Sequence, residues 1–370
     1  MTSLPIYLDH AATTIPEEAV VGAVAACMRA QPYNASAAYS ASGDARRIHR
    51  LARQRIAGML GCPPECICFT SGGTEANNWV IRSFAEGHVV LSAIEHHSIL
   101  EPARAHRCRI ALAAPDASGF VSPGSIEAAL TPDTKLVCLQ AANNETGVIQ
   151  PIREVYALLK ARHIHLHVDA VQAFGHIPVD ALCCDSMSLS AHKLYGPRGA
   201  GALYIRSGAS LAPLLLGGGQ ERNLRAGTEN TPAICGFDVA AELAAEDMQS
   251  RMDRERALLA GFIRRLQAAD ARLVLLGESR ERLPGVCALL LPGLSAEAVI
   301  ATMDLKGVMI SGGAACASHS GKPSHVYTAM GLSPEAASRV IRISIGRHTT
   351  AEQLDYAAEA LLSIMHRQAR

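Results

Sequence analysis

The sequence predicts an α/β protein, and two observations support this prediction. Segments with helical apolar spacing alternate with short strand-like runs along the 370-residue chain, which is typical of sheets covered by helices. In addition, ECICFTSGGTEANNWVIRSFA has the pattern of a strand, a tight turn and a helix. Units of this kind are the building blocks of α/β architecture.

The individual elements follow from apolar spacing and from signals at their ends. ARRIHRLARQRIAGMLG has apolar residues three and four apart and closes on Gly61, so we expect a helix there. Strand-like runs are expected to begin or lie within 65–70, 88–100, 134–140, 165–171, 187–193 and 201–207, with a helix at 152–163. A long Ala-, Glu- and Arg-rich helix is expected at 236–270, before strands in 272–277 and 286–293, a helix from Ser295, and a closing strand, loop and helix over 340–365.

Composition is that of an ordinary soluble globular enzyme. Apolar residues make up 49% of the chain and charged residues 18%. Lys+Arg and Asp+Glu are both 34, so the balance gives no support for direct nucleic-acid binding or an anionic membrane as the main partner. MTSLPIYLDHAATT resembles neither a secretory signal nor a transit peptide, and no run reaches the roughly 18 apolar residues of a membrane span. We therefore expect a cytoplasmic protein.

Two clusters raise the question of a metal site. GCPPECICFT holds three of the 11 cysteines, but no second Cys or His pair has zinc-ligand spacing, and Cys68 lies in a strand-like run. HIHLHVD places His163, His165 and His167 on one face of a strand by the period of two. No carboxylate cluster with ligand spacing accompanies these histidines. We therefore assign no resident metal and interpret the cysteines as structural.

Lys193 stands beside Ser190 and His192 at the end of an apolar run, in SMSLSAHKLYGPRGAGALYI. Twenty-four residues upstream, HLHVDAVQ ends another apolar run with Asp169. A lysine to hold an aldehyde and a carboxylate to pair with a pyridinium nitrogen are the two groups that pyridoxal phosphate requires from a protein. The ordinary alternative is a surface lysine after a strand.

Three loops of small residues suggest anion binding or nucleophilic chemistry. TSGGTEANN offers free amides at a helix start and the Thr74 hydroxyl to a phosphate, although a plain helix cap is the alternative. GGGQERNLRAGTEN could hold an anion through Arg225 and Thr228, or form an irregular surface loop. GGAACASHSGKPSHV is expected to expose Cys316, which would suit a nucleophilic thiolate, although an incidental surface cysteine is the alternative.

Two further positions have functional and structural interpretations. His96 in EHHSIL follows a strand, and it could lie flat on an aromatic cofactor ring or serve as a helix cap. Arg342 in VIRISIGRHTT projects from a strand end, which suits bidentate capture of a carboxylate. Arg347 competes for that role, and both arginines could be structural ion-pair partners.

Taken together, these motifs resemble those of the cysteine desulfurases, which are pyridoxal-phosphate enzymes of the class V aminotransferase type. The similarity is to the nitrogen-fixation and iron–sulfur-assembly branch and runs from about residue 6 to the C-terminus. The motifs are YLDHAATT, FTSGGTEANN, EHHSIL, NNETGVIQPI, HVDAVQAFG, SLSAHKLYGPRGAGALY, GGGQERNLRAGTEN, SGGAACAS and IRISIGRHTT. The resemblance implies a fold type I transferase with a large domain (14–250) and a smaller α/β domain (1–13 and 251–370). The large domain would hold a mostly parallel seven-stranded sheet, and the small one the nucleophile loop.

The resemblance also implies roles for the matching residues. Lys193 would bind the cofactor aldehyde, Cys316 would be the nucleophile, and His96 would stack on the ring. The cofactor would contact Gly73, Thr74, His96, Asn144, Asp169, Gln172, Ser190, His192, Lys193 and Thr228. Thr228 would come from the second subunit, which implies a homodimer. Arg342, with Asn144, would bind the substrate.

The implied reaction removes sulfur from L-cysteine, giving L-alanine and a persulfide on Cys316. The sulfur would pass to an acceptor such as an iron–sulfur scaffold protein, with at most a transient cluster contact through Cys316. A selenocysteine lyase or another class V enzyme is the alternative. A non-catalytic sulfur-relay protein would lack Lys193, Asp169 or Cys316, and all three are present. The pathway, whether iron–sulfur assembly, nitrogenase maturation, tRNA thiolation or DNA phosphorothioation, stays open at this point.

Overall fold

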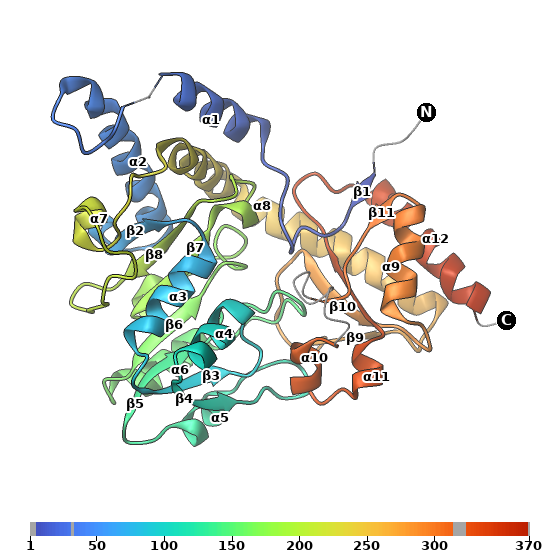
Figure 1. The fold of residues 1–370 in the computed structure, drawn as a ribbon. Coiled ribbons are helices and arrows are strands. Elements are labelled where there is room, and N and C mark those ends of the chain that lie inside the picture. Colours follow the sequence, from blue (N-terminus) through green and yellow to red (C-terminus); the bar gives the residue numbers. More distant parts are fainter. Residues whose placement is uncertain (1–4, 31–32, 314–322, 369–370) are drawn as a thin grey trace.

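A seven-stranded sheet forms the core of the larger part of the fold, on the left of Figure 1. Its strands are β2 (Ile67–Thr70), β3 (His88–Ser92), β4 (Arg109–Ala113), β5 (Thr134–Cys138), β6 (His165–Asp169), β7 (Ser186–Ser190) and β8 (Gly201–Ile205). The structure, a computed structural model, describes residues 5–30, 33–313 and 323–368. In the order β2-β8-β7-β6-β5-β3-β4, β8 runs antiparallel to both neighbours and the other pairs are parallel. The predicted mostly parallel sheet is confirmed.

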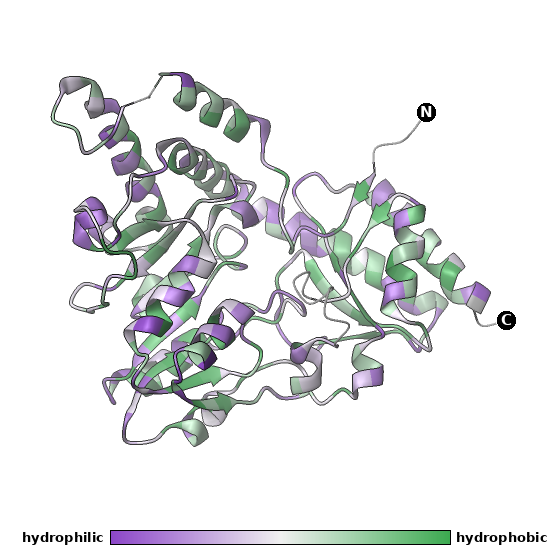
Figure 2. Ribbon diagram, viewed as in Figure 1, coloured by the Kyte–Doolittle hydropathy of each residue, from purple (hydrophilic) through white to green (hydrophobic). Residues whose placement is uncertain are grey.

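Helices cover both faces of this sheet because side chains alternate along each strand. Val90 belongs to the core on one face, whereas Val89 and Leu91 belong to the core on the other. The first face packs against α2 (Gly43–Leu60), α5 (Pro123–Ala129), α6 (Ile152–Lys160) and the start of α8 (Thr231–Ala269). The second face packs against α3 (Gly73–Ser83) and α4 (His97–Ala105). Figure 2 shows the hydrophobic residues concentrated on the strands between these layers.

A second group of strands lies on the right of Figure 1 and has its own hydrophobic core. One sheet has the order β12-β10-β9, and β1 pairs with β11 in parallel. The strands are β1 (Ile6–Tyr7), β9 (Val274–Leu275), β10 (Val286–Leu290), β11 (Val308–Met309) and β12 (Val340–Ser344). Helices α9 (Ala296–Leu305) and α12 (Ala351–Gln368) pack on this core. The short helices α10 (His325–Ala329) and α11 (Pro334–Ala337) lie beside it, and their buried residues belong to the core of the large sheet.

Helix α8 connects the two parts. Phe237, near its start, belongs to the core of the seven-stranded sheet, whereas Phe262, near its end, belongs to the second core. The helix was expected from residue 236, and it begins earlier because the Asn230 side chain caps it by accepting from Ala233 N–H (3.3 Å). The predicted division near residue 250 stays a prediction, because the core of the seven-stranded sheet also contains residues from beyond that point, such as Leu283 and Tyr327.

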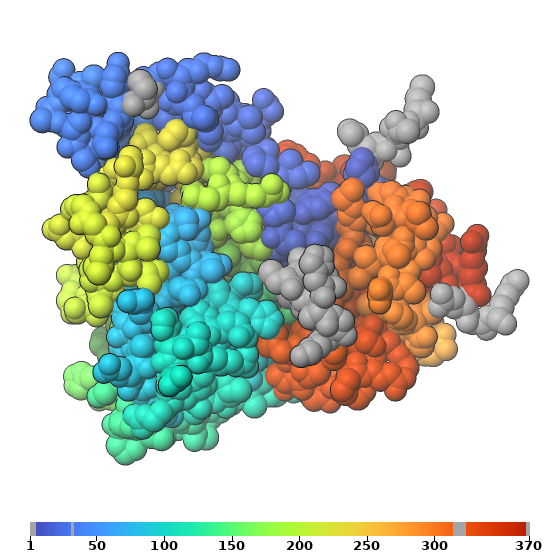
Figure 3. Space-filling view, viewed as in Figure 1, coloured from blue at the N-terminus to red at the C-terminus, as the bar shows by residue number. Residues whose placement is uncertain are grey.

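The N-terminus crosses between the two parts. After β1, residues 8–14, which we call the N-terminal strap, run toward the seven-stranded sheet, and Thr14 N–H donates to His192 O (3.0 Å). Figure 3 shows this segment at the junction. Helix α1 (Glu18–Ala30) follows and packs along α8. Within the described residues, no helix is long and apolar enough to span a membrane.

Candidate active site

A cavity of about 240 Å³ lies where the N-terminal strap meets the sheet. One water molecule needs only about 10–15 Å³, so the cavity can hold a small organic molecule. Ten of the residues singled out in the sequence line it: Gly73, Thr74, His96, Asn144, Asp169, Gln172, Ser190, His192, Lys193 and Arg342. Cys316 lies outside the described residues.

The topology explains why residues so distant in sequence meet. Parallel strands end at the same edge of a sheet, and α/β proteins bind ligands at that edge. Asp169 is the last residue of β6 and Ser190 the last residue of β7. His96 follows β3, and Gly73 follows β2, which points the same way because both β2 and β7 are antiparallel to β8.

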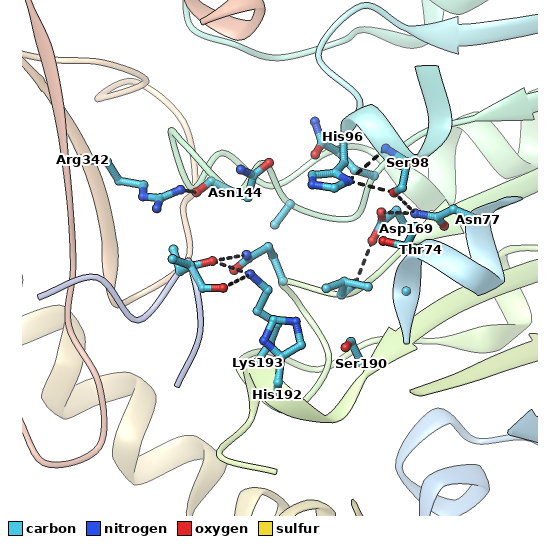
Figure 4. A pocket seen from close by; sticks show the side chains of 17 residues that line it. Thr74, Asn77, His96, Ser98, Asn144, Asp169, Ser190, His192, Lys193 and Arg342 are labelled. Carbon is cyan, nitrogen blue, oxygen red and sulfur yellow. Dashed lines mark hydrogen bonds between the residues drawn. The ribbon is translucent and has the colours of Figure 1, made fainter. Parts of the chain in front are cut away.

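Lys193 ends a short 3₁₀ turn directly after β7. Its Nζ donates to the carbonyl oxygens of Ala11 (2.5 Å) and Ala12 (2.8 Å) in the strap. Its own carbonyl accepts from His176 Nε2 (2.7 Å). The side chain is therefore anchored at its base while the amine lies at the cavity wall, as Figure 4 shows.

Asp169 is a buried carboxylate, 8% exposed, on the opposite side of the cavity from Arg342 (Figure 4). Its Oδ1 accepts from Val171 N–H (3.0 Å), and its Oδ2 accepts from the Asn77 side-chain amide (2.7 Å). Each carboxylate oxygen can accept two hydrogen bonds. Asp169 thus keeps acceptor capacity for a donor inside the cavity.

His96 combines its two sequence interpretations. It is the N-cap of α4, where its Nδ1 accepts from Ser98 N–H (3.1 Å), and it also lines the cavity. Burial lowers the pKa of His96, and the charge of Lys193 acts in the same direction. Because Nδ1 accepts a hydrogen bond, the neutral ring carries its proton on Nε2.

The start of α3 and the end of β7 form the polar end of the cavity nearest Asp169 (Figure 4). A Cβ added at Gly73 would lie 2.5 Å from Val171 Cγ2, so only glycine lets the helix start approach this closely. The free amides and positive dipole of a helix start attract anions, and Thr74 and Ser190 add hydroxyl groups. This end is suited to a phosphate group.

His192 also lines the cavity, next to Ser190 and Lys193. Its Nδ1 lies 3.0 Å from Thr13 Oγ1. Burial lowers the pKa of His192 to about 4, and the charges of Lys193 and Arg198 act in the same direction. The ring is therefore neutral at pH 7. Gln172 donates from Nε2 to Ala11 O (2.8 Å), the same carbonyl that accepts from Lys193.

Arg342 occupies the other end of the cavity and is 1% exposed. Its Nη2 donates to Asp9 Oδ1 (2.7 Å) and its Nη1 to Asn144 O (3.0 Å), whereas its Nε has no hydrogen-bond partner among the described residues. Arg347 instead pairs with Asp247 (3.1 Å) and does not line the cavity. The structure therefore places Arg342, not Arg347, at the site.

Thr228 is not brought to this cavity within one chain. It lines a separate cavity of about 150 Å³, together with Arg225. The predicted anion-binding role of Arg225 is not favoured there, because its guanidinium forms two hydrogen bonds to the Glu75 carboxylate (2.8 and 3.1 Å).

The histidines and cysteines considered as metal ligands belong to the large sheet and its connections. His163 precedes β6 and has φ +54°, so it does not share a strand face with His165 and His167 as predicted. Cys68 is fully buried in β2, and burial raises its pKa, as expected of a structural cysteine. Among residues that the structure describes, no three His, Cys, Asp or Glu side chains are grouped to hold a metal.

Four parts of the cavity wall were not predicted: the side chains of Asn77, Ser98 and Gln140, and the backbone of the strap. Asn77 hydrogen-bonds to Asp169, and Ser98 hydrogen-bonds to His96. The Gln140 side chain donates to Ile94 O (2.6 Å). Asn77 stands in the same TSGGTEANN motif as Thr74, which was the available signal. The strap contributes backbone carbonyls, for which side-chain patterns give no signal.

Comparison with known proteins places this site in a family. The sequence profile named aminotransferase class-V matches residues 6–357. The chain belongs to the class V aminotransferase family. A curated relative, "Cysteine desulfurase IscS" of Dictyoglomus turgidum, is 39% identical over 373 residues, covering 98% of this chain and 95% of the relative.

Two solved structures have the same fold as this member of the class V aminotransferase family. A "NifS-like protein" superposes with a TM-score of 0.91 at 30% identity, covering 98% of this chain and all of the other. A structure described as "SspA in complex with cysteine" has a TM-score of 0.80 at 32% identity, covering 93% of this chain and all of the other. The fold type expected from the motifs is confirmed.

Proposed function

We propose that the protein is a cysteine desulfurase that uses pyridoxal 5′-phosphate to remove sulfur from L-cysteine. The placement of Lys193, Asp169 and Arg342 around one cavity carries the proposal. An amine, a carboxylate and a guanidinium in this arrangement suit an aldehyde cofactor whose amino-acid substrate carries a carboxylate. The names of the relatives, and the neighbouring structure that contains cysteine, support the same activity.

The residues present fit the cofactor. When bound, pyridoxal phosphate supplies an aldehyde that condenses with amines and a protonated pyridine ring that withdraws electrons. Asp169 has acceptor capacity for the ring nitrogen, and the close approach at Gly73 leaves the α3 amides open to the phosphate. The other groups that would hold it are Thr74, His96, Asn144, Gln172, Ser190, His192 and Lys193.

Arg342 would bind and orient the substrate carboxylate. Its Asp9 and Asn144 contacts fix the guanidinium plane, and its Nε–H has no acceptor within the part of the chain that the structure describes. A fixed guanidinium aligns the substrate's Cα–H bond relative to the base, which lowers the entropic part of the barrier. Asn144 lines the same end and would contact the substrate.

Lys193 would take the proton from the substrate's Cα, since its amine lies at the cavity wall. The Cys316 thiolate would then attack the substrate sulfur. A sulfur–sulfur bond forms, the carbon–sulfur bond breaks, and its electron pair remains on the substrate carbon. Protonation of that carbon, the Cβ, and return of the proton from Lys193 to the Cα would yield L-alanine and leave a persulfide on Cys316.

We further propose that the protein acts as a homodimer in the cytoplasm. The position of Thr228 outside its own chain's Lys193 cavity supports a role for Thr228 in the partner's site. The persulfide sulfur would pass to an acceptor such as an iron–sulfur scaffold protein.

Alanine release and persulfide formation test this function. The cofactor-loaded protein should convert L-cysteine to alanine, and Cys316→Ser should stop persulfide formation while keeping the yellow cofactor bound. If the parent protein releases no alanine, the function is wrong. If Cys316→Ser releases sulfide at the parental rate, the nucleophile is wrong. The same assay with selenocysteine separates a selenocysteine lyase.

A further inference from the structure

Asn77 joins several groups behind the cavity wall. Its side chain is 1% exposed, on the first turns of α3. The Nδ2 atom donates to Asp169 Oδ2 (2.7 Å) and to Ser98 Oγ (2.8 Å), while Oδ1 lies 3.0 Å from His167 Nε2. Figure 4 shows Asn77 beside Asp169 and Ser98, on the side of both residues away from the cavity. Both amide hydrogens and the amide oxygen are therefore engaged.

The direction of each hydrogen bond follows from the chemistry of the partners. A carboxylate accepts, so the Asn77 atom facing Asp169 must be the NH₂ group. Asn77 Oδ1 then faces His167, which must donate from Nε2. Ser188 Oγ lies 3.2 Å from the same nitrogen, farther than Asn77 Oδ1, and can share this proton as a second acceptor. Burial lowers the pKa of His167 to about 3, so the ring is neutral and its Nδ1 carries no proton.

The series continues on the far side of His167. His167 Nδ1 lies 2.9 Å from Ser186 Oγ, which lies 2.8 Å from His165 Nε2. Since Nδ1 accepts, the Ser186 hydroxyl donates to it and in turn accepts from His165. Along the series from His165 through Ser186, His167 and Asn77, each group donates its hydrogen to the next group on the way to Asp169. This accounts for two histidines of the HIHLHVD motif, to which the proposed reaction assigns no role.

The same reasoning holds toward His96. Ser98 Oγ accepts from Asn77, and it lies 2.8 Å from His96 Nδ1, which already accepts from Ser98 N–H. The Ser98 hydroxyl therefore donates to His96. Asn77 thus contacts Asp169 directly and reaches His96 through one hydroxyl group.

We propose that Asn77, held in one amide orientation by His167, is a positioning residue that fixes the Asp169 carboxylate against the cofactor's ring nitrogen. This inference rests on the proposed function for its cofactor. If the amide were reversed, Asn77 Oδ1 would face the Asp169 carboxylate, and two acceptors would lie together in a buried site. The tautomer of His167 therefore reports the orientation of Asn77.

The first measurement needs no substitution at Asn77. Histidines of the full-length protein are labelled with ¹⁵N, and the His167 ring signals are identified by their absence in His167→Gln. We expect Nε2 to carry the proton and Nδ1 to have the shift of an acceptor nitrogen. A proton on Nδ1 instead would mean the reversed amide and would overturn the proposal.

The second measurement compares Asn77→Leu with Asn78→Leu. Leucine has nearly the shape of asparagine but no donor. Asn78, the next residue on α3, donates to Thr74 O (2.8 Å) and more weakly to Ser98 O (3.5 Å), and it has no hydrogen bond to Asp169 among the described residues. After removal and re-addition of pyridoxal phosphate, Asn77→Leu should bind it at least about tenfold more weakly, because it loses a hydrogen bond to a charged group. Asn78→Leu should stay within about twofold of the parent.

The outcomes separate the two proposals. If Asn77→Leu retains parental cofactor affinity, Asn77 does not position Asp169, whatever the protein catalyses. If the parent itself fails to bind pyridoxal phosphate, the proposed function fails. The His167 tautomer is measured in protein that keeps Asn77. The proposal can therefore be contradicted even if the Asn77→Leu variant does not fold.

Discussion

The functional side chains are held by local hydrogen bonds that leave one chemical group at the cavity. Lys193 is anchored through its carbonyl by His176, and Asp169 through Asn77 and Val171. Sequence patterns identified Lys193 and Asp169 because their residue types follow strand-like runs. Asn77 was missed because its partners Asp169 and His167 lie 92 and 90 residues away in the sequence, so the local pattern gives no sign of them.

Substitution of Arg342 by lysine tests the substrate-binding role. Lysine keeps the charge but loses the planar pair of donors, so the KM for L-cysteine should rise about tenfold or more. Pyridoxal phosphate affinity should stay within about twofold of the parent. Arg347→Lys is the matched control, because its ion pair with Asp247 can survive. A parental KM in Arg342→Lys would contradict the assignment.

His176 should make unfolding pH-dependent. Burial lowers its pKa to about 3 from the ordinary value of 6.5, with the charge of Arg251 acting in the same direction. The unfolded chain therefore binds one more proton between these values, and stability falls as pH falls from 6.5 toward 3. The slope from this residue is at most about 1.4 kcal/mol per pH unit.

Urea unfolding of the parent and of His176→Gln at pH 7, 6 and 5 measures this slope. Glutamine can still donate to Lys193 O but does not titrate. Between pH 6 and 5 the parent should lose up to about 1.4 kcal/mol more unfolding free energy than the variant. Equal losses would show that His176 is not held neutral.

Elements matched the sequence best where apolar periodicity was strong. The strands around β5 to β8 and the long helix α8 were expected from their patterns, with shifted ends. Helix α1 was not predicted, because EAVVGAVAACMRA mixes alanine, valine and glycine without a clear apolar stripe. Strand β9 covers two residues of the predicted 272–277 run. Its length depends on pairing with β10, which local sequence does not encode.

The start of α3 depends on Gly73. In Gly73→Ala the new Cβ would meet Val171 at 2.5 Å, so the helix start must move away from the loop after β6. We expect a lower melting temperature and about tenfold weaker pyridoxal phosphate binding, measured by thermal melting and by titration. Gly58→Ala in α2 is the control, since a Cβ there has no neighbour within 4 Å among the described residues and alanine favours helix. Cofactor binding at the parental level in Gly73→Ala would contradict this account.

The whole molecule brings the site together from both parts of the fold. β12 supplies Arg342, the large sheet supplies Asp169 and Lys193, and the strap closes the wall with the carbonyls of Ala11 and Ala12. The motifs predicted which side chains belong to the site. They gave no information on the strap's backbone contacts, because these depend on the tertiary path of the chain. The resemblance assigns Thr228 to a cofactor site. Within one chain, however, the fold places Thr228 at a separate cavity.

Hybrid dimers test the proposed exchange of Thr228. One subunit carries Lys193→Ala and the other Thr228→Ala, with different affinity tags for purification. If Thr228 acts in the partner's site, the hybrid contains one site with both residues intact, and half of the sites should bind pyridoxal phosphate with parental affinity. If every remaining site shows the weakened affinity of Thr228→Ala, the residue acts within its own chain.

Covalent capture of pyridoxal phosphate by Lys193 tests the central claim most directly. The cofactor is added to the purified protein, the adduct is reduced with borohydride, and the peptides are mapped by mass spectrometry. We expect a yellow protein, one cofactor mass on the peptide containing Lys193, and no such mass in Lys193→Ala. A colourless protein, or a cofactor attached at another lysine, would contradict the account.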